Sequence, residues 1–166
     1  MQQPTTPSRV LFAPAALMAA ILVGATALAC GDDTPTTPPP PTYNATLTGA
    51  SEVPVKAVAG TGTASVVKNG TTFTYTITYT GLTGTLSGAH IHGPAAVGVN
   101  AGIVVAFTVP AGSPATGTLT GTFTAPTAAT VSIDSLEVLL KNGNAYFNLH
   151  TAANPGGEIR GQIAKQ

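Results

Sequence analysis

The fold is decided by a ten-residue stretch near the middle of the chain, Thr71-Thr72-Phe73-Thr74-Tyr75-Thr76-Ile77-Thr78-Tyr79-Thr80. Large apolar residues alternate strictly with threonines from Thr72 to the end of this stretch. Successive side chains of a β-strand point to opposite faces of the sheet. The pattern therefore predicts a strand with one buried face, made of its aromatic residues and Ile77, and one hydrated face of threonines.

Seven further segments show the signs of short strands, namely 45–49, 62–68, 86–92, 103–109, 116–123, 145–151 and 158–164. Turn signals such as Asn69-Gly70 and Asn154-Pro155-Gly156-Gly157 separate them. Asn69-Gly70 also predicts a tight hairpin, because such turns require positive φ. About eight short strands with this punctuation predict an all-β fold, an antiparallel and Greek-key-like β-sandwich or barrel.

One segment, 134–141, breaks the alternation because its apolar residues are spaced as on one face of a helix. Ser132 or Asp134 can cap the start of this helix, and Gly143 can end it. We therefore expect one short helix at about 134–141 that closes one end of the β fold.

The beginning of the chain predicts export. Arg9 precedes an apolar run, 10–29, which is typical of a signal peptide, although a spanning helix of roughly 20 residues is the alternative. Cys30, the single cysteine, directly follows the small residue Ala29 and resembles the lipidated cysteine of bacterial lipoprotein signals. The sequence thus predicts a lipoprotein-type signal peptide at 1–29, cleavage before Cys30, and lipidation of that residue.

A proline- and threonine-rich segment, 30–42, follows the cysteine. Consecutive prolines favour an extended polyproline conformation, so this segment is expected to be a linker. The remaining part, 43–166, is long enough for one domain with its own core. We therefore expect an exported protein of the cell envelope, anchored to the membrane by its N-terminal lipid and carrying a single β domain.

Charge and motif content exclude several classes of function. Six basic and six acidic side chains balance to a net charge of zero, and no basic stripe indicates nucleic-acid binding. The sequence contains no Gly-X-Ser-X-Gly elbow and no phosphate-binding loop, and the four carboxylates of the predicted domain are scattered rather than paired. We therefore expect no catalytic residues and no enzymatic activity.

Two segments, 88–94 and 148–162, contain all three histidines. Alternation along the predicted strands places His90 and His92 on one face, Tyr146, Asn148 and His150 on another, and Glu158 with Arg160 on a third. If these strands are neighbours, the faces combine. The resulting candidate binding or structural cluster comprises His90, His92, Tyr146, Asn148, His150, Glu158, Arg160 and Glu52.

Five segments, 49–54, 60–62, 89–93, 145–151 and 154–162, resemble in this order the CHRD domain, which is repeated in chordin and occurs singly in many bacterial exported proteins. The resemblance covers 45–163 and departs at Val55, where the family often has a second proline. It implies an extracellular fold without a general biochemical activity. The leading hypothesis is therefore a non-enzymatic binding or structural module of the envelope, which needs no cofactor and has an extracellular or envelope protein as partner.

Two alternatives for the histidines stay open. The imidazoles of His90, His92 and His150 suit copper or zinc, and a His-X-His strand with a distant third histidine resembles copper/zinc superoxide dismutases. The other metal ligands, the arginine and the disulfide of those enzymes have no counterpart, so dismutation is not expected. In the second alternative the polar residues satisfy one another, with Glu158 and Arg160 bonded to neighbouring strands and His150 bonded to a carbonyl or to Glu52. Convergence of the three rings on one point would favour the metal.

Overall fold

The computed structural model describes residues 38–128 and 130–166. The predicted signal peptide at 1–29, the lipidation site Cys30 and most of the predicted 30–42 linker lie outside these residues. In the part of the chain that is described, no helix combines the length and the apolar character needed to cross a membrane.

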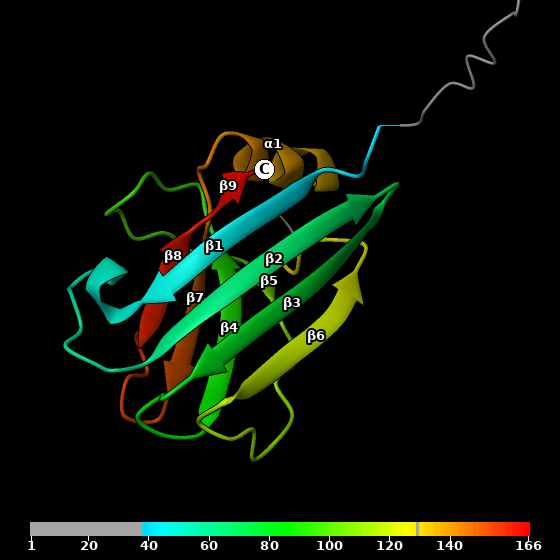
Figure 1. Cartoon of the computed structure of the whole chain (residues 1–166). Coiled ribbons are helices and arrows are strands. Elements are labelled where there is room, and N and C mark those ends of the chain that lie inside the picture. The colour runs from blue at the N-terminus through cyan, green and yellow to red at the C-terminus, as the bar shows by residue number, and fades with distance from the viewer. Residues whose placement is uncertain (1–37, 129) are drawn as a thin grey trace, which may run out of the picture. The chain divides into compact units, whose positions relative to one another are not determined.

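The described residues form one antiparallel sheet that curls into a half-barrel, accompanied by a single α-helix (Figure 1). The strands are β1 (Thr42–Thr48), β2 (Thr61–Asn69), β3 (Thr72–Thr80), β4 (Leu86–His92), β5 (Ile103–Ala106), β6 (Gly117–Phe123), β7 (Tyr146–Thr151), β8 (Ile159–Gln162) and β9 (Ala164–Lys165). A short 3-10 turn, η1 (Gly49–Ser51), follows β1, and α1 (Ile133–Lys141) precedes β7. The sheet order is β5-β4-β7-β8-β1-β2-β3-β6, with β9 paired to β1. The predicted all-β fold is confirmed.

The hairpin predicted at Asn69-Gly70 is present, with a shift of one residue. Asn69 still pairs with Thr72, so Gly70 and Thr71 form the turn. Gly70 adopts a φ of +59°, a conformation that glycine reaches without steric penalty. The alternating strand therefore begins at Thr72 rather than Thr71.

Two predicted strands end earlier than the sequence pattern indicates. The strand expected at 103–109 stops at Ala106, although the Phe107 N–H still donates to the Ala89 carbonyl of β4. The Ala106 N–H, on the open edge of β5, donates to the Thr127 hydroxyl. The strand expected at 158–164 divides into β8 and β9, and Ile163 between them donates its N–H to the Ala145 carbonyl. Loops thus satisfy backbone groups that the periodicity assigns to the sheet.

Aromatic side chains fill the space inside the curled sheet. Tyr75 of β3 packs against Phe107, which follows β5, with 4.2 Å between ring centroids. Phe107 also lies 6.0 Å from Phe147 of β7 and 6.1 Å from Phe123 of β6. These contacts join the two ends of the strand order across a single core, so that the sheet curls around one aromatic cluster.

The predicted helix is present as α1, with the expected ends. The Ser132 hydroxyl caps its start by accepting from the Ser135 N–H at 3.1 Å, and Gly143 follows its end at a φ of +66°. Leu136 and Leu140 are fully buried in the core. The helix covers one end of the half-barrel (Figure 1), as the sequence pattern predicts.

Strand β7 is buried on both faces, unlike the half-exposed β3. Phe147 and Leu149 belong to the apolar core. Tyr146, Asn148 and His150 point to the opposite side of the pleat and are nevertheless almost inaccessible to solvent. A second layer must therefore cover the outer face of β7.

Removing the side chain of Ile77 should weaken the core, since this residue is fully buried. We expect Ile77→Ala to lower the free energy of unfolding by about 3 kcal/mol, as measured by urea denaturation. The control Thr76→Ala, on the exposed face of the same strand, should change it by less than about 1 kcal/mol. Equal effects of the two substitutions would contradict the assignment of faces.

Candidate functional site

Strand pairing brings the predicted polar faces of β4, β7 and β8 side by side. His90 pairs with Asn148, His92 with Tyr146, and Asn148 with Arg160 on the other side. Because β7 lies between β4 and β8, these residues share the face that is turned away from the apolar core. We call this surface the polar face, and it comprises His90, His92, Tyr146, Asn148, His150 and Arg160.

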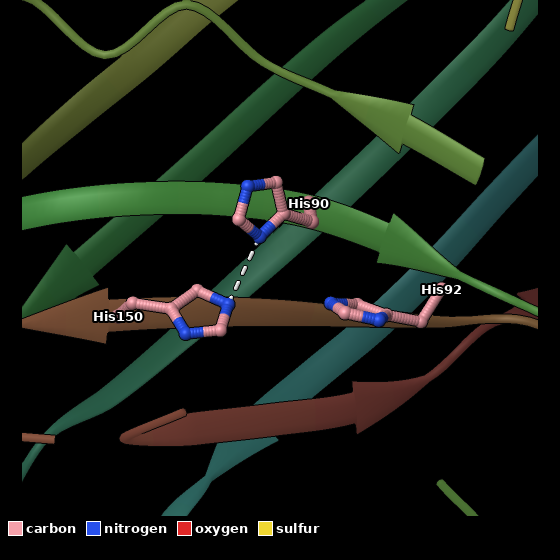
Figure 2. A group of neighbouring side chains, drawn as sticks. All are labelled: His90, His92 and His150. Carbon is pink, nitrogen blue, oxygen red and sulfur yellow. Dashed lines mark hydrogen bonds between the residues drawn. The ribbon is translucent and has the colours of Figure 1, made fainter. Parts of the chain in front are cut away.

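The three histidines converge on the polar face (Figure 2). Nδ1 of His90 lies 3.0 Å from Nε2 of His150, across the boundary between β4 and β7. One ring nitrogen from each of the three residues lies within 4.8 Å of the others. His92 and His150 are only 8% and 9% exposed, so the group is largely enclosed. The rings thus converge on one region, although two nitrogens bound to one ion at 2.1 Å can be at most about 4.2 Å apart.

Backbone carbonyls determine which nitrogen of two of the rings carries the proton. Nδ1 of His92 lies 2.9 Å from the Ala101 carbonyl, and Nδ1 of His150 lies 3.0 Å from the Pro155 carbonyl. A carbonyl only accepts hydrogen bonds, so Nδ1 is the protonated nitrogen in both rings. In the neutral rings each Nε2 then carries a free lone pair directed away from the carbonyl.

The two free lone pairs have different environments. Nε2 of His150 accepts a hydrogen bond, so the 3.0 Å contact with His90 requires the proton to lie on Nδ1 of His90. Nε2 of His92 is buried and has no hydrogen-bond partner among the described residues. An unpartnered acceptor is unusual in a protein interior and indicates a place where a further group can bind.

The surroundings hold all three rings in the neutral form. Burial, together with the neighbouring His150 and His92, lowers the pKa of His90 to about 4. Burial also lowers the pKa of His92 and of His150, although their bonds to carbonyls act in the opposite direction. Neutral imidazole is the form that binds metals. The rings are therefore ready to act as ligands at neutral pH.

The segment between β4 and β5, 93–102, forms the layer over the polar face, and we call it the covering loop. Arg160 holds it in place by donating to the Val99 carbonyl at 2.7 Å and to Oδ1 of Asn100 at 3.0 Å. The same loop supplies the Ala101 carbonyl that orients His92. The orientation of His92 thus depends on a loop that is held from β8.

An aromatic column links Arg160 to the histidines. The guanidinium carbon of Arg160 lies 3.4 Å from the centroid of the Tyr146 ring, a cation–π contact. The Tyr146 ring in turn stacks on the His92 ring, with 4.9 Å between centroids and 4° between planes. Because β7 lies between the other two strands, Tyr146 separates the cation from the imidazole.

Glu52 reaches the cluster from outside the three strands. It is 4% exposed, and its Oε1 approaches Gly157 together with the side-chain amide of Asn148. A Cβ at Gly157 would lie 2.6 Å from Oε1 of Glu52, and the φ of this residue is +125°, so only glycine fits here. Burial raises the pKa of Glu52, and its Oε1 and the Asn148 Oδ1 have no partner among the described residues.

Glu158 does not join the polar face, contrary to the expectation that it shares a face with Arg160. Its carboxylate accepts from the N–H and hydroxyl of Thr83, both at 2.6 Å, from the Thr151 hydroxyl at 2.5 Å and from Asn154 at 3.1 Å. Burial alone would raise the pKa of Glu158, but these bonds outweigh it and lower the pKa. Alternation fails because β8 begins only at Ile159, after the bend at Gly157.

Sequence reasoning missed the groups that orient the histidines. The acceptors for His92 and His150 are backbone carbonyls of Ala101 and Pro155. Every residue carries such a carbonyl, so no residue type signals this role. The sequence allowed a bond from His150 to a backbone carbonyl as one alternative. The path of the chain after β7 decides that this carbonyl belongs to Pro155.

A protein-family model described as the CHRD domain matches residues 43–163. This range contains the three histidines, the covering loop, Glu52 and Arg160, and thus the whole of the cluster described above. Comparisons with curated proteins and with solved structures returned no match to the chain.

The lowered pKa of His90 predicts acid sensitivity of the metal-free protein. Because this pKa falls from 6.5 to about 4, the unfolded chain binds more protons than the folded protein between these values. Stability is therefore full above pH 6.5 and declines as the pH falls through this window. We expect His90 to account for a loss of about 1–2 kcal/mol, since solvent screens its half-buried ring.

Urea denaturation at pH 7 and pH 4.5, with a chelator present, measures this loss. The variant His90→Gln cannot titrate at this position and should lose less stability than the wild type over the same range. Equal losses in the two proteins would show that His90 does not contribute.

Proposed function

The chain belongs to the CHRD domain family, and from this premise we propose that its domain is a non-enzymatic module that binds a transition metal, copper or zinc. The ligands are Nδ1 of His90 and Nε2 of His92 and His150. One observation carries the proposal: three neutral imidazoles converge within 4.8 Å, and one of their buried nitrogens has no other partner.

The distances are close to those of a three-histidine site. Metal–nitrogen bonds of 2.0 to 2.1 Å in tetrahedral geometry separate the nitrogens by roughly 3.3 Å. Nδ1 of His90 and Nε2 of His150 are 3.0 Å apart, but the group as a whole spans 4.8 Å, so the rings must rotate inward for all three nitrogens to bind one ion. His90 must also transfer its proton from Nδ1 to Nε2, which frees the lone pair directed at His150.

The carbonyl bonds support the same proposal. Metal-binding histidines generally donate their other N–H to a carboxylate, a carbonyl or water, which fixes the tautomer and the plane of the ring. His92 and His150 already make such bonds to Ala101 and Pro155. These bonds orient both rings before any ion binds, which reduces the entropy lost on binding.

The surroundings favour binding over catalysis. The group of potential ligands contains no carboxylate, and the Glu158 carboxylate is occupied by four hydrogen bonds from Thr83, Thr151 and Asn154. Dismutase activity is not part of the proposal.

The location is proposed from the sequence. A lipid on Cys30 would hold the protein at a membrane of the cell envelope, with the proline-rich linker, which ends where β1 begins at Thr42, separating the domain from the surface. In this position the domain would encounter metal ions and extracellular or envelope proteins.

Isothermal titration of the purified protein with Zn²⁺ and with Cu²⁺ tests the metal site. We expect saturable binding of one ion per chain. Replacing one ligand in His92→Gln should weaken binding at least tenfold, roughly the lower limit seen when a metal-site residue is lost. The control Thr76→Ala, on the exposed face of β3, should bind as the wild type does. Absence of saturable binding, or binding unchanged in His92→Gln, would refute the function.

Membrane fractionation tests the anchor. Cys30→Ser removes the thiol that would carry the lipid and should move the protein from the membrane to the soluble fraction, whereas Thr34→Ser should leave it in place. Incorporation of labelled fatty acid should be lost in Cys30→Ser alone. A Cys30→Ser protein that still requires detergent for extraction would contradict the lipid anchor.

A further inference from the structure

We infer that the three-histidine site prefers copper in its monovalent state over zinc. This inference rests on the metal-binding function proposed above and specifies the ion. It follows from the charge of the donor set, the burial of the site and the position of Arg160.

The donor set carries no negative charge. Among the described residues the group of potential ligands consists of His90, His92 and His150, all of them neutral. Neither cysteine nor methionine occurs in 38–128 or 130–166, so no thiolate or thioether joins them there. A bound ion therefore keeps its full charge, one unit for Cu⁺ and two for Zn²⁺.

Burial makes this difference in charge important. His92 and His150 are 8% and 9% exposed, and the covering loop lies over part of the site. The free energy needed to transfer an ion from water to a low-dielectric interior increases with the square of its charge, so the divalent ion loses about four times as much solvation as the monovalent one. Three neutral nitrogens provide no attraction between opposite charges that would offset this loss of solvation.

A fixed positive charge acts in the same direction. The Arg160 guanidinium stacks on Tyr146, which stacks on His92, and its hydrogen-bond partners are the neutral Val99 carbonyl and Asn100 amide. Burial raises the pKa of Glu52, and the charge of Arg160 offsets part of this rise, but the two side chains form no ion pair. The positive guanidinium lies one aromatic ring away from His92. It repels a divalent ion about twice as strongly as a monovalent one.

The number of protein ligands points to the same ion. Zinc in proteins is almost always four-coordinate and would need a water or hydroxide in addition to the three imidazoles. Cu⁺ accepts three ligands without a fourth. Among divalent ions, nitrogen sites bind Cu²⁺ more tightly than Zn²⁺. Copper is thus favoured in either oxidation state, and the neutral donor set adds the preference for Cu⁺.

Competition titrations of the full-length protein measure the preference. Cu⁺ is kept reduced with ascorbate and buffered with bicinchoninate, and Zn²⁺ is buffered with a chromophoric zinc chelator. We expect the dissociation constant for Cu⁺ to be at least about 100-fold lower than that for Zn²⁺, which corresponds to the repulsion of one extra unit charge at close range. Zinc binding as tight as that of Cu⁺, or tighter, overturns this inference and leaves the metal-binding function in place. Binding of neither ion overturns both.

A variant with an added negative charge tests the electrostatic cause. Asn148 lies at the centre of the polar face, paired with His90 on one side and with Arg160 on the other. Asn148→Asp changes the charge with little change of shape, and we expect it to reduce the ratio of Cu⁺ to Zn²⁺ affinity at least tenfold. The control Asn44→Asp, on β1, should leave the ratio unchanged. An unchanged ratio in Asn148→Asp, with circular dichroism showing a folded protein, refutes the charge argument.

Discussion

A buried polar face on a central strand is the constraint on which this structure depends. Tyr146, Asn148 and His150 of β7 are turned away from the apolar core, yet they are almost inaccessible to solvent. Buried polar groups require hydrogen-bond partners, and water does not reach these side chains freely. The Tyr146 hydroxyl accepts from the Ala101 N–H of the covering loop, and His150 donates to the Pro155 carbonyl in the turn after β7, whereas Oδ1 of Asn148 has no partner among the described residues. Arg160 on β8 stacks on Tyr146 and holds the covering loop. The polar face therefore organises three segments that lie far apart in the sequence.

The same constraint accounts for the chemistry of the histidines. Two of them use Nδ1 to satisfy backbone carbonyls, which leaves Nε2 as the acceptor in each. The interior provides one donor for these two acceptors, the Nδ1–H of His90, and Nε2 of His92 remains without a partner. A metal ion would engage all three nitrogens at once. The two alternatives of a satisfied network and a metal site thus coincide in part: the hydrogen bonds that stabilise the face are those that orient the ligands.

Much of the fold could be predicted from local patterns. The alternation in β3, the hairpin at Gly70 and the cap of α1 at Ser132 depend on residues close together in the chain, and the structure contains all three. The grouping of His90 and His92 also follows from strand periodicity alone. Periodicity failed for Glu158, because a bend at Gly157 separates it from β8. Its partners Thr83, Thr151 and Asn154 include a residue 75 positions earlier in the chain, which no local pattern indicates.

The amino-acid sequence by itself determined the all-β class, the helix, the resemblance to the CHRD family and the residue types from which a site can be built. These depend on side-chain periodicity and composition, which are local properties. Only the tertiary structure decided that β4, β7 and β8 are neighbours, that Arg160 acts through Tyr146 and the covering loop, and which nitrogen of His92 and His150 is free. Those features depend on strand order and on backbone carbonyls. Strand order depends on contacts between distant segments, and backbone carbonyls are the same in every residue. Neither feature can therefore be recognised from the sequence alone.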